Sequence, residues 1–244
     1  MRTRHPSSSK LLTTSPPMNP VAPVTSAVRV MPPIYTGRMR FGWVIPCVLG
    51  ALGLFLARNA GDGTLGFYGF TVFSAAVYAA GWWLWGSKNA FAGPRIGREL
   101  GRGVLIGAVL AIVFVLGALV VQNIPFLAGP VEQLLNTPDQ GGLLPTFFVL
   151  VINGIGEELV YRDMVPRQLR ERFPRLPEIS VGVVSTLIYG VVTIAMGVPL
   201  LVFSALVLGA VAFYEASRSR RLYSPIAVHL TWSVTMLLVM PLFF

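Results

Sequence analysis

Several residue types that support common protein functions are scarce in this chain. Its single cysteine, Cys47, cannot form an intrachain disulfide, and no cysteine pair has the spacing of a zinc or redox motif. Cys47 lies in an apolar run, where a small packing residue is expected. There are only two histidines, His5 and His229, and no HExxH motif. These absences exclude disulfide scaffolds and the common zinc-binding motifs.

Charge is also scarce, and long apolar runs take its place. Charged residues make up 12% of the chain and hydrophobic residues 54%, with a mean hydropathy of +0.69. Soluble domains carry about 25% charged residues. Several apolar runs reach the roughly 17–25 residues that cross a bilayer as a helix. The composition therefore predicts an all-α, polytopic membrane protein with about seven transmembrane helices. The expected spans are residues 41–57, 65–85, 103–121, 143–161, 179–195, 198–214 and 225–243.

The positions of Lys and Arg predict the orientation of these helices. The net charge is +9, and 18 of the 19 Lys and Arg residues fall on one side of the predicted spans. Only Arg58 falls on the other side. Cytoplasmic loops carry the excess of positive charge, so we expect the N-terminus in the cytoplasm. This asymmetry explains the basic charge without a nucleic-acid partner, and leaves the lipid bilayer as the expected partner.

The chain divides into a polar tail and an apolar domain. Residues 1–40 are rich in Pro, Ser and Thr, contain six basic residues and show no apolar periodicity. We expect a disordered, basic cytoplasmic tail there rather than a signal peptide. Residues 41–244 are expected to form the transmembrane domain. Within it, Gly103 and Gly107 form a GxxxG pattern, which we interpret as helix packing rather than a dimer motif.

Two adjacent carboxylates, Glu157 and Glu158, close the apolar run that begins at Leu143. Glu158 and Arg162 are spaced i and i+4, so they share a helix face and can pair. One interpretation is that both acids cap the helix at the headgroups, but the macrodipole disfavours acids at a helix C-terminus. His229 lies at a matching depth in the last predicted span. Ionisable residues inside a membrane indicate a functional site.

Two carboxylates and an imidazole can activate a water molecule. One Glu acts as general base, and the imidazole stabilises an oxyanion or moves a proton. A metal site is supported only weakly, because one His and two Glu make a thin ligand set. A transporter or proton-linked channel could also use such acids as a relay. The lack of internal repeats and of paired broken helices argues against transport.

The order of the polar motifs resembles a known family. The segment "GEELVYRDMVPRQLRERF" contains EExxxR followed by a basic stretch, and "STLIYGVVTIAMG" and "SPIAVHLTWSV" complete the likeness over residues 143–243. The chain resembles the CAAX-processing and bacteriocin-processing (CPBP, or Abi) family of intramembrane glutamic proteases. That family includes the type II CAAX prenyl endopeptidases and bacterial relatives linked to bacteriocin immunity.

The resemblance implies roles for the first motif. Glu157 would be the main water-activating residue, Glu158 its partner and Arg162 the structural counter-charge. His229 would be the histidine of the last motif, HxxxN, in which Ser233 stands where asparagine is common. The resemblance implies no cofactor.

The middle motif, FxxxH, departs from the family pattern. It falls on Tyr189 and Thr193, so an aromatic residue remains but threonine replaces the histidine. Threonine can hydrogen-bond to water but does not titrate near neutral pH. Thr193 also lies deeper in its predicted span than His229 does.

Two functions follow from the resemblance. The first is an intramembrane endopeptidase that hydrolyses a membrane-associated protein or peptide through a water activated by Glu and His. The second is a catalytically inactive member that acts as a membrane binding or immunity protein, for which Thr193 and Ser233 are the motivation. Either way we expect a multi-pass integral protein of a bacterial plasma membrane.

Overall fold

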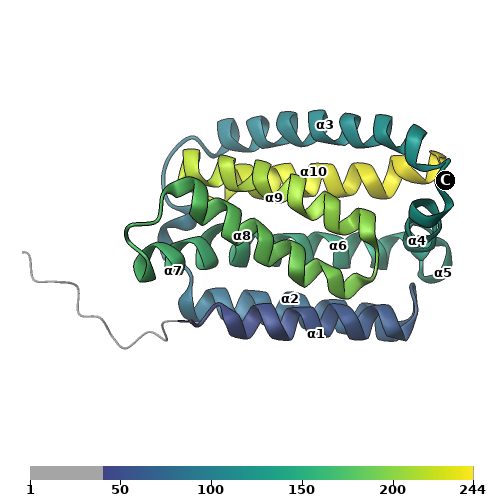
Figure 1. The fold of residues 1–244 in the computed structure, drawn as a ribbon, viewed down its shortest axis with the longest axis horizontal. Helices are drawn as coiled ribbons and strands as arrows, with labels where there is room; N and C mark the ends of the chain where they lie inside the picture. The colour runs from purple at the N-terminus through teal and green to yellow at the C-terminus, as the bar shows by residue number, and fades with distance from the viewer. Residues whose placement is uncertain (1–40, 244) are drawn as a thin grey trace, which may run out of the picture. The chain divides into compact units, whose positions relative to one another are not determined.

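The computed structural model describes residues 41–243, and the predicted tail over residues 1–40 lies outside the described residues. The described chain is helical from end to end, without a strand (Figure 1). The α-helices are α1 (Val44–Ala60), α2 (Leu65–Trp85), α3 (Ile96–Val121), α4 (Pro125–Leu135), α5 (Thr137–Gly141), α6 (Leu143–Glu158), α7 (Val165–Arg172), α8 (Glu178–Thr193), α9 (Pro199–Ser219) and α10 (Tyr223–Val239). Short helical segments of other types are η1 (Lys88–Phe91), η2 (Leu159–Met164), η3 (Ile194–Met196) and η4 (Met240–Phe243).

The prediction of an all-α, polytopic membrane protein is confirmed. Six helical stretches are long and apolar enough to cross a membrane, and α1 supplies a shorter apolar helix of 17 residues. Together they match the seven predicted spans, although α3 begins at Ile96 and α9 continues to Ser219. Large apolar side chains remain exposed on their outer faces, such as Leu105 and Ile112 at 67% and 60%. Such a surface suits contact with lipid rather than water.

Two short helices, α4 and α5, were not predicted. They lie between α3 and α6, where the sequence contains three prolines and reads as a loop. Pro125 stands at the start of α4 and Pro138 at the start of α5, positions at which proline favours a helix because its missing N–H is not needed.

The arginine-rich segments come together at one end of the described helices. The α2–α3 connection, η2 with α7, and the α9–α10 turn lie there, whereas α4 and α5 lie at the opposite end (Figure 1). The Ser87 N–H donates to the Asp163 carboxylate at 2.6 Å, and Arg221 donates to the Pro94 carbonyl at 2.6 Å. These bonds tie the three segments to one another. The membrane side that this end faces stays a prediction from the positive charge.

Helices α3 and α10 pack closely through glycine. A Cβ atom on Gly107 would lie 2.6 Å from the backbone oxygen of Val228, and one on Gly103 would lie even closer to the backbone oxygen of Ser224. The GxxxG pattern therefore serves packing within the chain, as predicted. His229 directly follows Val228 on α10, so this contact also fixes the depth of the histidine.

We predict that Gly107→Ala lowers stability by about 1–3 kcal/mol, because the added methyl group overlaps backbone rather than a movable side chain. Gly117→Ala is the matched control on the same helix, where an added Cβ meets nothing within 4 Å. That change should be neutral or stabilise by about 0.5–1 kcal/mol. Thermal unfolding in detergent measures both, and equal midpoints for the two variants would contradict the packing described.

Candidate active site

Helix α6 does not end at the two acids but continues as a π-helix. Segment η2 follows Glu158 directly and leads into α7, which begins at Val165. Pro166 has no N–H to donate to the Arg162 carbonyl, so a regular α-helical bond is impossible there. The wider turn accommodates this loss, and such π segments are frequent at functional sites.

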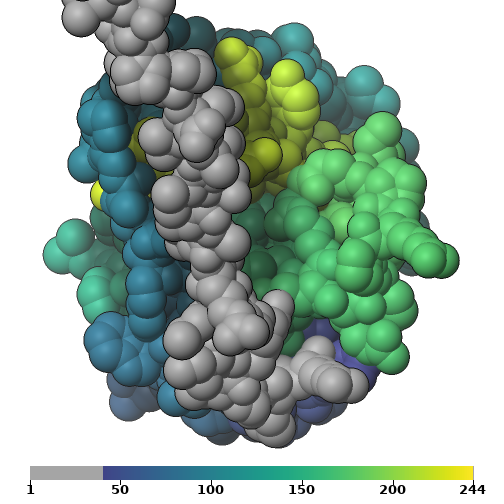
Figure 2. All heavy atoms as spheres, turned by 90° about the vertical axis from the view of Figure 1, so that its left-hand side faces the viewer, coloured from purple at the N-terminus to yellow at the C-terminus, as the bar shows by residue number. Residues whose placement is uncertain are grey.

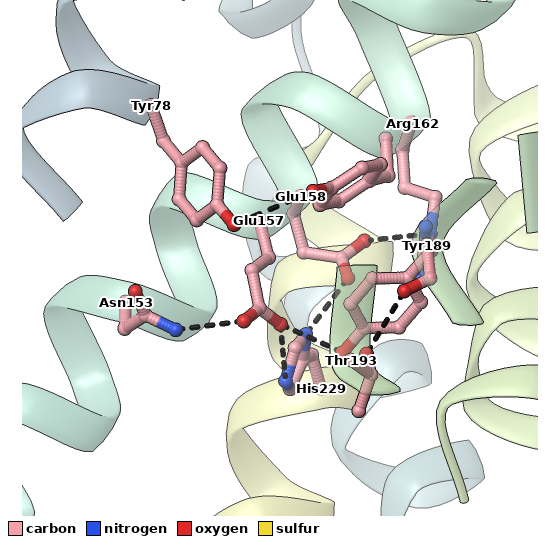
Figure 3. A network of polar contacts seen from close by, with 9 residues as sticks. Tyr78, Asn153, Glu157, Glu158, Arg162, Tyr189, Thr193 and His229 are labelled. Atoms are coloured by element: carbon pink, nitrogen blue, oxygen red, sulfur yellow. Dashed lines mark hydrogen bonds and ion pairs between the residues drawn. The ribbon is translucent and has the colours of Figure 1, made fainter. Parts of the chain in front are cut away.

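Glu158 forms a buried charge cluster with Arg162 and His229. Its Oε1 lies 2.8 Å from Nδ1 of His229, and its Oε2 lies 3.3 Å from Nε of Arg162. The side chains of Glu158 and Arg162 are both 0% exposed. The guanidinium of Arg162 also lies over the ring of Tyr189, at 4.7 Å (Figure 3). The predicted i, i+4 pair is therefore present, and the histidine from the last helix completes it.

The carboxylate of Glu157 lies near Nε2 of His229, on the opposite side of the ring from Glu158. Asn153 Nδ2 donates to Oε1 of Glu157 at 2.7 Å, and the Tyr189 hydroxyl donates to its Oε2 at 2.7 Å. His229 Nε2 lies 3.8 Å from the same Oε2 (Figure 3). Residues from α6, α8 and α10 thus hold one carboxylate in a fixed orientation. One histidine bridges the two acids, with a different ring nitrogen for each.

Glu157 and His229 border a cavity of about 240 Å³. Most of its wall is apolar, and it also includes Asn153, Thr193 and Ser233. The wall continues along α6 to Leu134 and Thr137, which belong to α4 and α5. The cavity thus extends away from the arginine-rich end.

Thr193 and Ser233 both border the cavity. Thr193 is the last residue of α8, and its hydroxyl donates to the Tyr189 carbonyl at 2.9 Å. Helix α8 runs obliquely to α6, so the greater depth of Thr193 in its span does not take it away from the site (Figure 1). Ser233 lies one turn after His229 and makes no hydrogen bond to another described residue.

Sequence reasoning missed Asn153 and the hydroxyl of Tyr189 as partners of Glu157. Asn153 precedes Glu157 by four residues in an apolar run, and that spacing was the available signal. Its Oδ1 is buried without a partner among the described residues, as is Nε1 of Trp232, another cavity residue. The resemblance placed Tyr189 in the middle motif of the site, but no local pattern pairs its hydroxyl with Glu157, because the contact joins residues 32 positions apart.

Within residues 41–243, no group of three or more His, Cys, Asp or Glu side chains is arranged to hold a metal ion. Glu157, Glu158 and His229 lie close together, but the imidazole is placed between the carboxylates. Their geometry is that of hydrogen bonding and charge pairing.

We predict that Arg162→Met destabilises the protein by about 3–5 kcal/mol, because it leaves the buried Glu158 without its counter-charge. Arg170→Met is the control, since Arg170 pairs with Glu178 where both side chains are about half exposed, at 43% and 51%. Such surface pairs contribute about 0–1 kcal/mol. Thermal unfolding compares the two variants. Similar losses at both positions would show that the buried pair has no special structural role.

Comparison with known proteins agrees with the motifs. Residues 139–235 match a family model described as type II CAAX prenyl endopeptidase Rce1-like. The matched segment begins before α6 and ends within α10, so it contains both acids, Arg162 and His229. No curated protein and no solved structure matches the chain. The resemblance to the CAAX-processing family is thereby confirmed over residues 139–235, which are similar to the type II CAAX prenyl endopeptidases.

Proposed function

We propose that this protein is an intramembrane endopeptidase in which Glu157 activates the hydrolytic water. The observation that carries the proposal is the setting of Glu157. Asn153 and Tyr189 hold its carboxylate at 2.7 Å each, beside His229 and at the wall of a buried cavity. A general base needs such a fixed position next to the space that substrate and water occupy.

The reaction follows from this arrangement. A water molecule between Glu157 and the substrate gives a proton to the carboxylate while its oxygen bonds to the peptide carbonyl carbon. The tetrahedral intermediate then collapses, the C–N bond breaks, and Glu157 returns the proton to the leaving amine nitrogen. The products are a new carboxylate and a new amino terminus. Each step uses one carboxylate first as base and then as acid.

His229 stabilises the charge that develops on the carbonyl oxygen. In the imidazolium form both ring nitrogens carry a proton, so Nδ1–H donates to Glu158 at 2.8 Å, which fixes the ring, while Nε2–H faces Glu157 and the cavity and can donate to the oxyanion. Donors that are oriented before the reaction stabilise an oxyanion most effectively. Glu158 and Arg162 act on the substrate only through this histidine, so they are positioning residues.

The cavity favours an apolar, extended peptide segment as substrate. Leucine is the most frequent residue in its wall, which also contains Phe67, Val149, Met196 and Met236. The Oδ1 of Asn153 and the Nε1 of Trp232 are an unused acceptor and an unused donor among the described residues. A main chain that enters the cavity can satisfy both, since each peptide unit carries one N–H and one C=O. A membrane-associated protein or peptide meets these requirements.

One observation favours a second function, that of a catalytically inactive member. The Thr193 hydroxyl donates to the Tyr189 carbonyl, so it is not free to donate to an oxyanion in this arrangement. The protein would then bind a membrane peptide or partner in the same cavity without cleaving it. An immunity function belongs to this second candidate.

We predict that Glu157→Gln abolishes the cleavage of membrane proteins in cells, with a rate loss of about 10²–10⁴-fold. Glutamine keeps the shape and hydrogen bonds but cannot take a proton. Profiling of new protein N-termini in membranes compares the native chain with this variant. Glu132→Gln, an exposed acid on α4, is the matched control and should resemble the native chain.

The same profile separates the two candidate functions. N-termini that vanish only in Glu157→Gln support the protease and identify its substrate. Identical profiles for the native chain and Glu157→Gln, with new termini in Thr193→His, would instead support the inactive relative. Identical profiles in all arms would contradict proteolysis by this fold.

We predict that Tyr189→Phe lowers the rate of cleavage about 10–100-fold and leaves KM nearly unchanged. The change removes one hydrogen bond to a charged acceptor, about 1.5–3 kcal/mol, but keeps the ring over Arg162. Tyr214→Phe, on the exposed face of α9, is the control and should match the native enzyme. The measurement is steady-state kinetics on a substrate found by the N-terminal profile. A Tyr189→Phe enzyme with native kcat would contradict a positioning role.

A further inference from the structure

A second pocket lies at the arginine-rich end of the described helices. It has a volume of about 680 Å³ and is separate from the cavity at Glu157. Its wall combines three segments that are distant in sequence: the α2–α3 connection, η2 with α7, and the α9–α10 turn. Figure 2 views this end, with the α2–α3 connection in blue and the residues that follow η2 in green.

The pocket is strongly basic. Two carboxylates of the described residues border it, Asp163 and Glu178, against five arginines. The arginines are Arg162, Arg167, Arg170, Arg220 and Arg221. Guanidinium groups match the geometry of phosphate and carboxylate oxygens through paired N–H bonds. Three carboxylates outside the lining, Glu158, Glu171 and Glu99, pair with Arg162, Arg167 and Arg221, so among the described residues Arg220 is the pocket arginine without an ion pair. Five guanidinium groups around one hollow, one of them unpaired, indicate an anion site.

Arg162 provides an independent indication of a ligand. Its side chain is 0% exposed, yet Nε, Nη1 and Nη2 have no hydrogen-bond partner among the described residues. The Glu158 oxygen at 3.3 Å forms an ion pair without the alignment of a hydrogen bond. Buried donors are normally satisfied, and a guanidinium without partners is rare. Arg162 is one of the residues that line the basic pocket.

The other arginines are arranged around the same hollow. Arg167 and Arg170 are held in place by Glu171 at 3.0 Å and by Glu178 at 2.6 Å. Arg220 follows the last residue of α9 and has the left-handed backbone conformation, with φ of 55°. Residues other than glycine adopt this conformation rarely. The guanidinium of Arg220 makes no hydrogen bond to another described residue and is exposed. Arg220 is thus available to a ligand.

We propose that this pocket binds a phosphate-bearing anion, with Arg162 and Arg220 as its main donors. The phosphate would supply the acceptors that Arg162 lacks, from the side opposite to Glu158. The volume exceeds that of a single phosphate ion, so it also admits the headgroup of an anionic phospholipid. Headgroups lie at the level of the arginine-rich ends of transmembrane helices, which makes lipid and free phosphate the two sources to separate.

The test is a binding experiment on the full chain in nonionic detergent, so it does not depend on proteolysis. The probes are inorganic phosphate, dihexanoylphosphatidylglycerol and dihexanoylglycerol, the last of which lacks the phosphate. Native mass spectrometry measures Kd for each. Arg220→Gln should weaken phosphate binding about tenfold or more, because it removes charge-assisted hydrogen bonds. Arg218→Gln, an exposed arginine of α9 outside the pocket, should leave Kd unchanged.

Arg162→Lys extends the test to the buried donor. It keeps a positive charge beside Glu158 but loses the planar fork, so the expected Kd rises about tenfold. Saturation by inorganic phosphate alone would identify a soluble anion, and binding of the phospholipid alone would identify a headgroup, both in support of the site. Equal binding of dihexanoylglycerol, or equal losses in Arg218→Gln and Arg220→Gln, would overturn the proposal. Native affinity in Arg162→Lys would do the same.

Discussion

The structure depends on the neutralisation of one buried carboxylate. Glu158 has no exposed surface, and an uncompensated charge there would be strongly destabilising. Arg162 compensates it from the next turn of the same helix, and His229 does so from α10. Arg162 belongs to the π-helical turn that follows Glu158. His229 lies on α10 directly after Val228, which packs against Gly107 of α3. Burial of the cluster thus constrains the local backbone and the packing of helices that are distant in sequence.

The same cluster gives the two adjacent acids different partners. Because Glu158 is engaged with Arg162 and His229, Glu157 is left to face the cavity, and the neutral donors Asn153 and Tyr189 hold it there. This asymmetry is what supports a proton-transferring function for Glu157 and a positioning function for Glu158. It also separates an apolar cavity on one side from a basic pocket on the other.

Much of this fold could be predicted from hydropathy and charge alone. Apolar runs give the length of a span directly, so seven helices and the clustering of the arginines at one end were predictable. Helices α4 and α5 were not, because a proline at a helix start looks the same in sequence as a proline in a loop. The π-helix was also unpredictable, because the missing N–H at Pro166 could equally have ended or kinked the helix.

Prediction of the site was limited because contacts between distant residues have no local sequence pattern. The motifs identified Glu157, Glu158, Arg162 and His229, because the spacing of each motif is local. The contact between Tyr189 and Glu157 joins two helices, and the direction of the cavity depends on how α5 packs against α6. Neither has a local signature. The sequence shows Thr193 where the family has histidine. It does not show that the Thr193 hydroxyl donates to a backbone carbonyl.

The central claim is that Glu158 holds His229 through Nδ1 and so leaves Nε2 and Glu157 to the cavity. The chain has only two histidines, so ¹⁵N-histidine labelling of the His5→Ala protein gives the signals of His229 alone. We expect Nδ1 to keep its proton in the native protein, and Glu158→Gln to change the Nδ1 shift. A native spectrum with the proton on Nε2 alone, or one that is unchanged in Glu158→Gln, would contradict it.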